Sequence, residues 1–167
     1  RTGDRVGIIS PQMTPQWAEV EVTVSGATES EADLSNTGMA WGSDSHYDFY
    51  AFYPADAVQT NSGSIVVTAI PAVQTCNNGE CNMQYAYMAA CTQGVERGAE
   101  VPFRFRPLMT TVTIQVGFSE AAEVQKLVLS SENGPIAGGF TFDIETDRCS
   151  VIAGKGSNVL ALHLMSG

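Results

Sequence analysis

Apolar and polar residues alternate along most of the chain with a period of two residues. In residues 19–24, for example, Val20, Val22 and Val24 alternate with glutamate and threonine. Successive side chains of a strand point to opposite faces, so this pattern predicts a half-buried β-strand. The same reasoning predicts further strands at residues 6–10, 47–53, 64–70, 84–88, 101–105, 111–116, 124–129, 140–144 and 159–164.

Turn-forming residues separate these segments. Gly, Pro, Asn, Asp and Ser cluster at residues 54–56, 61–63, 133–135 and 154–156. The best helical candidate is residues 119–124, one or two turns long, and residues 26–41 are expected to form a long surface connection. Together these features predict an all-β fold, an antiparallel sandwich or barrel of about seven to ten short strands with little helix. The length suits a single domain over residues 1–167.

Charge narrows the function classes. The chain has 167 residues, a formal net charge of −10 and only two lysines, Lys126 and Lys155. Such a chain is repelled by phosphate backbones and anionic lipid surfaces, so neither nucleic acid nor an anionic membrane is an expected partner. No apolar run reaches the roughly 20 residues of a membrane-spanning helix. No signal segment opens the sequence, so if the protein is exported, this chain is expected to be a processed form or a piece cut from a longer one.

Four cysteines are present, Cys76, Cys81, Cys91 and Cys149. In an oxidising compartment they permit two disulfides, and the sequence leaves three pairings open. Cys76 and Cys81 bracket a turn-rich insert, where a local bridge would leave Cys91 to pair with Cys149. Four reduced thiols are the alternative. A zinc site is disfavoured because the spacing departs from paired C-x2-C motifs and no histidine is close in sequence.

Catalytic motifs are incomplete. The Gly-Lys-Gly-Ser sequence at residues 154–157 lacks the first glycine of a phosphate-binding loop and the hydroxyl residue after the lysine, so it is expected to be a turn between strands. A Ser-His-Asp hydrolase would need His46 or His163, and no G-x-S-x-G elbow accompanies them. The sequence therefore predicts neither an enzyme nor a cofactor.

Two polar clusters and one aromatic run offer other binding chemistry. Asp44, His46 and Asp48 would share one face of a strand, but an exposed group of this kind is expected to be solvated, and no metal site is predicted. The acidic run at residues 29–33 lacks a calcium loop. An alternative function, a monomeric secreted carbohydrate-binding module, would stack its ligand on the aromatic side chains of Tyr47, Tyr50 and Tyr53.

Several segments occur in an order that resembles the Bacteroidales fimbrillin-like proteins. Residues 47–54 (Y-D-F-Y-A-F-Y-P) are similar to that family's "Y-x-F-x-A-Y-Y-P" strand, and residues 70–74 (I-P-A-V-Q) to its "I-P-x-x-Q". Residues 101–112 (V-P-F-R-F-R-P-L-M-T-T-V) are similar to "V-x-L-x-F-x-H-x-(L/M)-(S/T)-x-(L/V)". Residues 124–129 and 136–140 resemble the strand and "(I/L)-x-G-x-(F/Y)" turn that follow.

The resemblance covers about residues 40–145 and implies a Greek-key sandwich of transthyretin-like type, the N-terminal domain of a two-domain protein. It implies an exported subunit or adhesin on the cell surface, in the stalk, anchor or tip of a fimbria. Outer-membrane anchoring would use a lipidated N-terminus outside this chain. The implied partners are other fimbrial subunits, through strand exchange, and an unidentified ligand on a host or bacterial surface.

The resemblance also assigns a role to the first predicted strand, which would be displaced during assembly. Its residues are Val6, Gly7, Ile8, Ile9 and Ser10. In the family, a trypsin-like protease often makes the cut that removes this strand. Here no Arg or Lys lies between residues 6 and 95, so Arg1 and Arg5 are the only nearby basic residues, and Arg5 is the candidate processing site. Pro107 stands where the family often has histidine.

Overall fold

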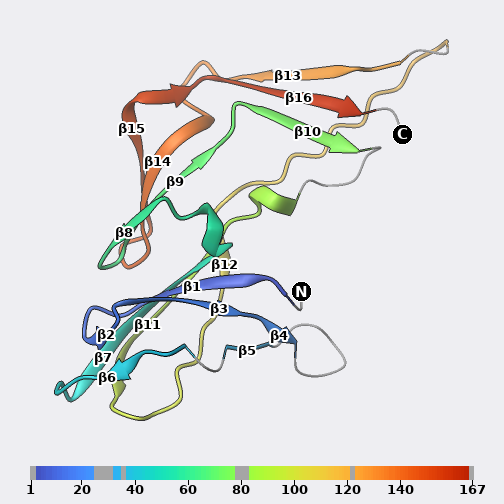
Figure 1. Ribbon diagram of the computed structural model, residues 1–167. Helices are drawn as coiled ribbons and strands as arrows, with labels where there is room; N and C mark the ends of the chain where they lie inside the picture. Colours follow the sequence, from blue (N-terminus) through green and yellow to red (C-terminus); the bar gives the residue numbers. More distant parts are fainter. Residues whose placement is uncertain (1–2, 25–31, 35–36, 78–82, 121–122, 166–167) are drawn as a thin grey trace.

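The computed structural model describes residues 3–24, 32–34, 37–77, 83–120 and 123–165 (Figure 1). Two short 3₁₀ helices, η1 (Ala55–Ala57) and η2 (Met83–Tyr85), interrupt an otherwise β structure. The strands in these ranges are β1 (Arg5–Ile9), β2 (Met13–Thr14), β3 (Trp17–Glu21), β4 (Thr23–Val24), β5 (Ala32–Asp33), β6 (Ala40–Trp41), β7 (His46–Tyr53), β8 (Thr60–Ser62), β9 (Ile65–Ile70), β10 (Val73–Asn77), β11 (Met88–Glu96), β12 (Arg106–Pro107), β13 (Lys126–Ser130), β14 (Ala137–Asp143), β15 (Arg148–Ser157) and β16 (Val159–Met165).

The central sheet has the strand order β12-β11-β7-β1-β3 and is antiparallel throughout. A second antiparallel sheet, β15-β14-β9-β8, packs against one of its faces. The two sheets share a buried cluster to which the central sheet contributes Ile9 and Phe52 and the second sheet Val66, Phe140 and Phe142. The expected all-β sandwich is confirmed. The alternation of apolar and polar residues produces this sandwich, because each strand then presents one apolar face to the opposite sheet.

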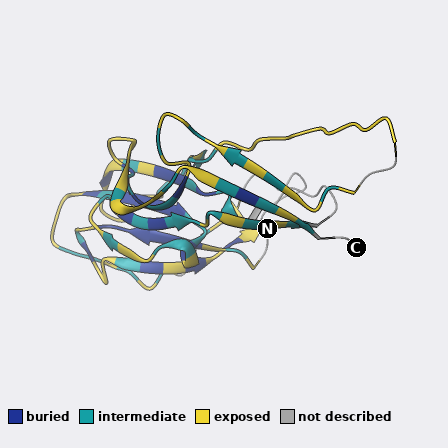
Figure 2. Ribbon diagram, turned by 90° about the horizontal axis from the view of Figure 1, so that it is seen from above, coloured by how far each residue is buried: buried dark blue, intermediate teal, exposed yellow. Residues whose placement is uncertain are grey.

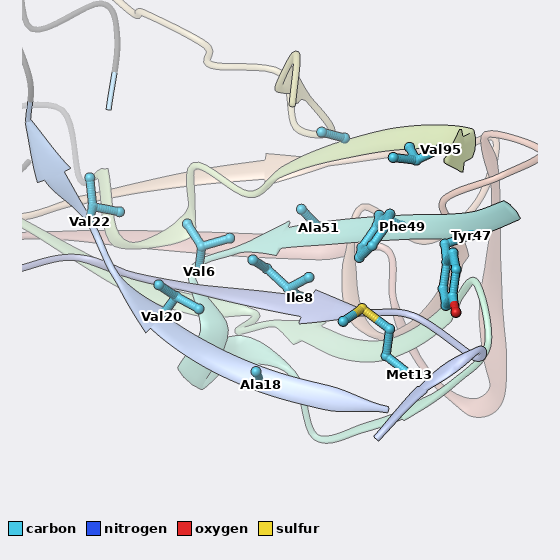
Figure 3. Close-up of a cluster of buried hydrophobic side chains, with 11 residues drawn as sticks. Val6, Ile8, Met13, Ala18, Val20, Val22, Tyr47, Phe49, Ala51 and Val95 are labelled. Atoms are coloured by element: carbon cyan, nitrogen blue, oxygen red, sulfur yellow. The ribbon is translucent and has the colours of Figure 1, made fainter. Parts of the chain in front are cut away.

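The other face of the central sheet carries a second buried cluster, which includes Val6, Ile8 and Phe49 (Figure 3). No further sheet of more than two strands covers this face in the described chain. Half-buried side chains from irregular segments pack on it instead, among them those of Leu34 and Phe103. One face of the sheet is therefore closed by strands and the other by loops.

A third sheet, β10-β16-β13, extends away from these two layers (Figure 1). β13 pairs with β16 in antiparallel fashion, whereas β10 runs parallel to β16. Residues 108–120 lead into this sheet from β12 and have no strand assignment. Their extended course gives the molecule its long projecting end, which is yellow, and so exposed, along most of its length in Figure 2.

Three expected strands differ from the structure. Residues 84–88 begin in η2, and the strand that follows, β11, runs on to Glu96 through a segment without clean alternation. Residues 101–105 alternate in burial, and residues 111–116 are exposed, but neither range has a ladder partner among the described residues. A period of two predicts an extended backbone, but a strand also needs a neighbour, which only the tertiary fold supplies.

Other expectations need smaller corrections. The glycine turn expected at residues 154–156 lies inside β15, where Gly154 has φ +72° near a shift in the β14–β15 register. The strand segments outnumber the expected seven to ten because several are two-residue pairs such as β2 with β6. The helical candidate at 119–124 lies partly outside the described residues, and its described part shows no helix.

Candidate functional site

The first strand lies inside the central sheet and not at its edge. β1 pairs with β3 from Arg5 opposite Glu21 to Ile9 opposite Trp17, and it pairs on its other side with β7. Over residues 7–9 the backbone of β1 is therefore paired on both sides. Removing β1 would leave two facing strands with unpaired N–H and C=O groups, a slot that another extended chain could fill.

The side chains of β1 enter both cores. Val6 and Ile8 are buried beside Phe49 and Ala51, as Figure 3 shows, while Ile9 is buried in the cluster between the two sheets. Ser10 is also fully buried, and its backbone N–H donates to the carbonyl oxygen of Gln16 (3.0 Å). The slot thus has apolar pockets on alternate sides, a pattern that selects a strand by its side chains.

Gly7 is the one position of β1 where a side chain does not fit. A Cβ atom built there would collide with the indole ring of Trp17, which projects from the neighbouring β3. On the other side Gly7 lies opposite Phe52 of β7. The ring of Trp17 therefore occupies the space that a side chain at position 7 would need.

Polar contacts hold the N-terminal end of β1. The hydroxyl of Tyr53 donates to Oδ2 of Asp4 (2.8 Å), and the backbone N–H of Val22 donates to the carbonyl oxygen of Asp4 (2.7 Å). Arg5 forms a surface ion pair with Glu19 (3.0 Å), an interaction of small energy in water. Because Arg5 is the first residue of β1, a cut after it would leave residues 6–9 in the sheet.

An open apolar groove of about 1440 Å³ adjoins β1 on the loop-covered face. Its lining includes Val6, Ile8, Met13, Trp41, Phe103 and Phe105. Three carboxylates and one guanidinium also line it, those of Asp4, Asp33, Glu100 and Arg104. Since Val6 and Ile8 belong to this lining, loss of β1 would join its slot to the groove.

A second set of contacts ties the two sheets together at the turn between β14 and β15. Glu145 accepts hydrogen bonds from the hydroxyl of Tyr50 (3.1 Å) and from Nε2 of Gln93 (3.1 Å), both in the central sheet. Arg106 pairs with Asp147 and donates to the carbonyl oxygen of Ile144 (3.3 Å). Sequence reasoning missed this cluster because its members are 38 to 95 residues apart.

Comparison with known families agrees with the motif order. The sequence model of the fimbrillin-like family matches residues 2–161, nearly the whole chain. The chain belongs to the fimbrillin-like family. Searches among curated proteins and among solved structures gave no significant match. Membership places the chain among structural subunits of cell-surface fimbriae, which associate with other pilus subunits.

The aromatic strand of this fimbrillin-like chain offers no exposed stacking platform. Tyr47 and Tyr50 are 0% and 4% exposed, and Tyr53 is half-buried with its hydroxyl on Asp4. Burial raises the pKa of Tyr50 to about 12, with the neighbouring carboxylate of Glu145 adding to the effect. These side chains build the core, so their positions do not favour the carbohydrate-binding alternative.

No disulfide joins Cys91 and Cys149 in this structure, where both are free thiols; their pairing was one of the three that the sequence leaves open. Cys91 lies opposite Tyr50 in the central sheet, whereas Cys149 lies opposite Phe142 in the second sheet, so the two belong to different layers. Partial burial raises the pKa of both thiols. The pairing of Cys76 with Cys81 stays a prediction, because Cys81 lies outside the described residues.

The polar cluster on β7 is engaged in structural contacts. Oδ2 of Asp48 accepts from Nε2 of Gln12 (3.3 Å) and Oδ1 accepts from the backbone N–H of Gly94 (2.9 Å), while Nδ1 of His46 is 3.0 Å from the hydroxyl of Ser45. Within the described ranges, no group of three or more His, Cys, Asp or Glu residues could hold a metal ion. The acidic run at 29–33 lies mostly outside them. No described helix is long and apolar enough to span a membrane.

Proposed function

We propose that this fimbrillin-like chain is a cell-surface fimbrial subunit or adhesin of a Bacteroides-type bacterium, and that it assembles by strand complementation with β1 as the exchanged strand. The observation that carries the proposal is the position of β1 between β7 and β3. An edge strand would leave only a shortened sheet when displaced. A central strand leaves a slot that a donor strand from another subunit can fill on both sides.

The donor strand would have to reproduce the contacts that β1 makes. It needs apolar residues in place of Val6, Ile8 and Ile9, and a glycine in place of Gly7, because the indole of Trp17 occupies that space. Main-chain hydrogen bonds to β3 and β7 would supply affinity, and these pockets would supply specificity. A matching pattern of apolar residues around one glycine is therefore expected in the partner.

The release of β1 differs from that of a subunit cut just after its first strand. Cleavage after Arg5 would free only residues 1–5 and leave residues 6–9 of β1 in the sheet, and the next Arg or Lys in the sequence is Arg97. We infer that β1 leaves the sheet uncut, beginning at the end held by Asp4 and Tyr53. Export, lipid anchoring at the outer membrane and adhesion to a host or bacterial surface are parts of the proposal that family membership supports.

Binding of a labelled peptide tests the proposed exchange of β1 for a strand from another subunit. A fluorescent peptide with the sequence of residues 1–10 would be added to a variant that lacks these residues, and separately in excess to the full chain. We expect saturable binding to the truncated chain and slow uptake by the full chain. The control peptide carries valine in place of Gly7 and is expected not to bind, because its side chain meets Trp17. Equal binding of both peptides, or uptake of neither, would contradict the proposal.

A further inference from the structure

Residues 110–118 have the pattern of a strand but no sheet. Their sequence is T-T-V-T-I-Q-V-G-F, and every residue in this stretch is exposed. Val112, Ile114, Val116 and Phe118 are 61%, 44%, 46% and 54% exposed. A contiguous run of large apolar side chains in water is unusual for a monomer and marks an interaction surface. The alternation of β-branched residues indicates that the missing partner is another strand.

A free sheet edge lies close to this segment in the sequence. β13 is the last strand of the β10-β16-β13 sheet, so its outer backbone groups have no ladder partner among the described residues. Such an edge is a template for a further strand. One face of this sheet carries five half-buried leucines from the edge strand β13 and its neighbour β16, and we call it the leucine face. The five are Leu127, Leu129, Leu160, Leu162 and Leu164. An added strand with apolar residues on that side would extend the leucine face.

The two elements diverge in space. Figure 1 shows the chain running from β12 to the far tip and returning along β13, so that residues 110–118 and β13 resemble the open arms of a hairpin. The same long arm stands away from the sheets in Figure 2. Open arms of this kind can close within one chain or exchange between two chains.

The distribution of charged side chains favours strand exchange between two copies of the chain. The chain carries a net charge of −10, so most of its surface repels a second copy. Residues 110–118 contain no charged side chain, and in β10, β13 and β16 the only formal charge at neutral pH is that of Lys126. This nearly neutral, apolar surface is therefore where two copies can approach without that repulsion.

We propose that a second copy of the chain supplies the missing partner, with residues 110–118 of each copy adding antiparallel to the β13 edge of the other. The contact is reciprocal, which produces a two-fold dimer. In this arrangement Val112, Ile114 and Val116 lie on the face of the sheet that carries Leu127 and Leu129. This contact uses neither β1 nor its slot, so it goes beyond the proposed function and can fail independently of it.

Sedimentation of the full chain over a range of concentrations tests the dimer, with Ile114→Lys as the variant. A lysine at this position would meet the leucine face, so we expect the dimer to be lost. Ile65→Lys is the matched control, because Ile65 has nearly the same exposure (43%) but lies in β9, and it is expected to leave the dimer intact. Val116→Lys repeats the test, and circular dichroism checks that each variant is folded.

Hydrogen exchange completes the test. Amides of residues 111–117 and the outward amides of β13 should be protected in the wild-type dimer and lose that protection in Ile114→Lys. A wild-type chain that is monomeric at every concentration would overturn the proposal, and protected β13 amides in that monomer would show closure within one chain. A dimer that survives both Ile114→Lys and Val116→Lys would also overturn it. Tyr53→Phe, which loosens β1, is expected to leave this dimer unchanged.

Discussion

The indole ring of Trp17 lies over Gly7, so that a Cβ atom at position 7 would overlap it. The two residues are on neighbouring strands, and the small residue makes room for the large one on the face that meets the second sheet. Substitution of Gly7 therefore changes the packing at the centre of the first strand. This pair gives the most direct test of how β1 is held.

Gly7→Val is expected to destabilise the protein by about 1–3 kcal/mol, the usual cost of overpacking a core. Urea unfolding measures the change. In a Trp17→Ala background the cost of Gly7→Val should shrink, since the overlapping ring is gone. A cost that stays the same in that background would contradict the assignment.

Tyr53→Phe is expected to loosen the start of β1. The change removes the hydroxyl that donates to the carboxylate of Asp4 and should cost about 1.5–3 kcal/mol, the net value of a hydrogen bond to a charged group. Amide exchange of residues 6–9 should become faster, and uptake of the peptide of residues 1–10 by the full chain should accelerate. Tyr85→Phe serves as a control, because Tyr85 lies in η2, outside the central sheet. Unchanged exchange in β1 would show that this contact does not hold the strand.

Alkaline pH is expected to weaken the fold through Tyr50. Burial raises the pKa of Tyr50 to about 12 from an ordinary value of 10.0. Between these two values the unfolded chain loses this proton while the folded chain keeps it, so stability falls as pH rises from about 10 to about 12. Tyr50→Phe should reduce this dependence. In the variant, the absorbance titration at 295 nm should lose a tyrosine that ionises near pH 12, and an unchanged titration curve would refute the assignment.

Asp143 should contribute the opposite dependence in acid. The hydroxyls of Thr146 and Ser64 donate to its carboxylate, at 2.6 and 2.7 Å, and lower its pKa below the ordinary 3.8. Stability from these contacts is present above that value and is lost as pH falls through the lower pKa of the folded state. Asp143→Asn should flatten the acid limb of the stability curve. An acid limb that is as steep in Asp143→Asn as in the wild type would contradict this assignment.

Cys91 and Cys149 should react slowly with thiol reagents. Both are free, and burial raises the pKa of each thiol above 9.0, so little thiolate is present at neutral pH. The labelling rate should rise with pH beyond 9. Mass spectrometry of the unreduced protein should locate both labels, and Cys91→Ser and Cys149→Ser should each remove one. Failure of both residues to label at high pH would indicate a disulfide.

The sequence by itself determined the local elements. Alternation at residues 47–53 predicts β7, the valines at positions 20 and 22 predict the strand around β3, and residues 6–10 predict β1, because a period of two places one face in a core. The order of motifs along the chain also indicates the fimbrillin-like family, which the match over residues 2–161 confirms. These signals are local, so they can be read without knowing what each segment contacts.

Only the tertiary structure decided which strands are neighbours. It placed β1 between β7 and β3, set Trp17 over Gly7, and joined Tyr50 to Glu145, 95 residues later. It also left residues 111–116 without a sheet, although their alternation is as clear as that of β3. The physical reason is that backbone hydrogen bonds between strands depend on long-range pairing, which a residue pattern permits but does not specify.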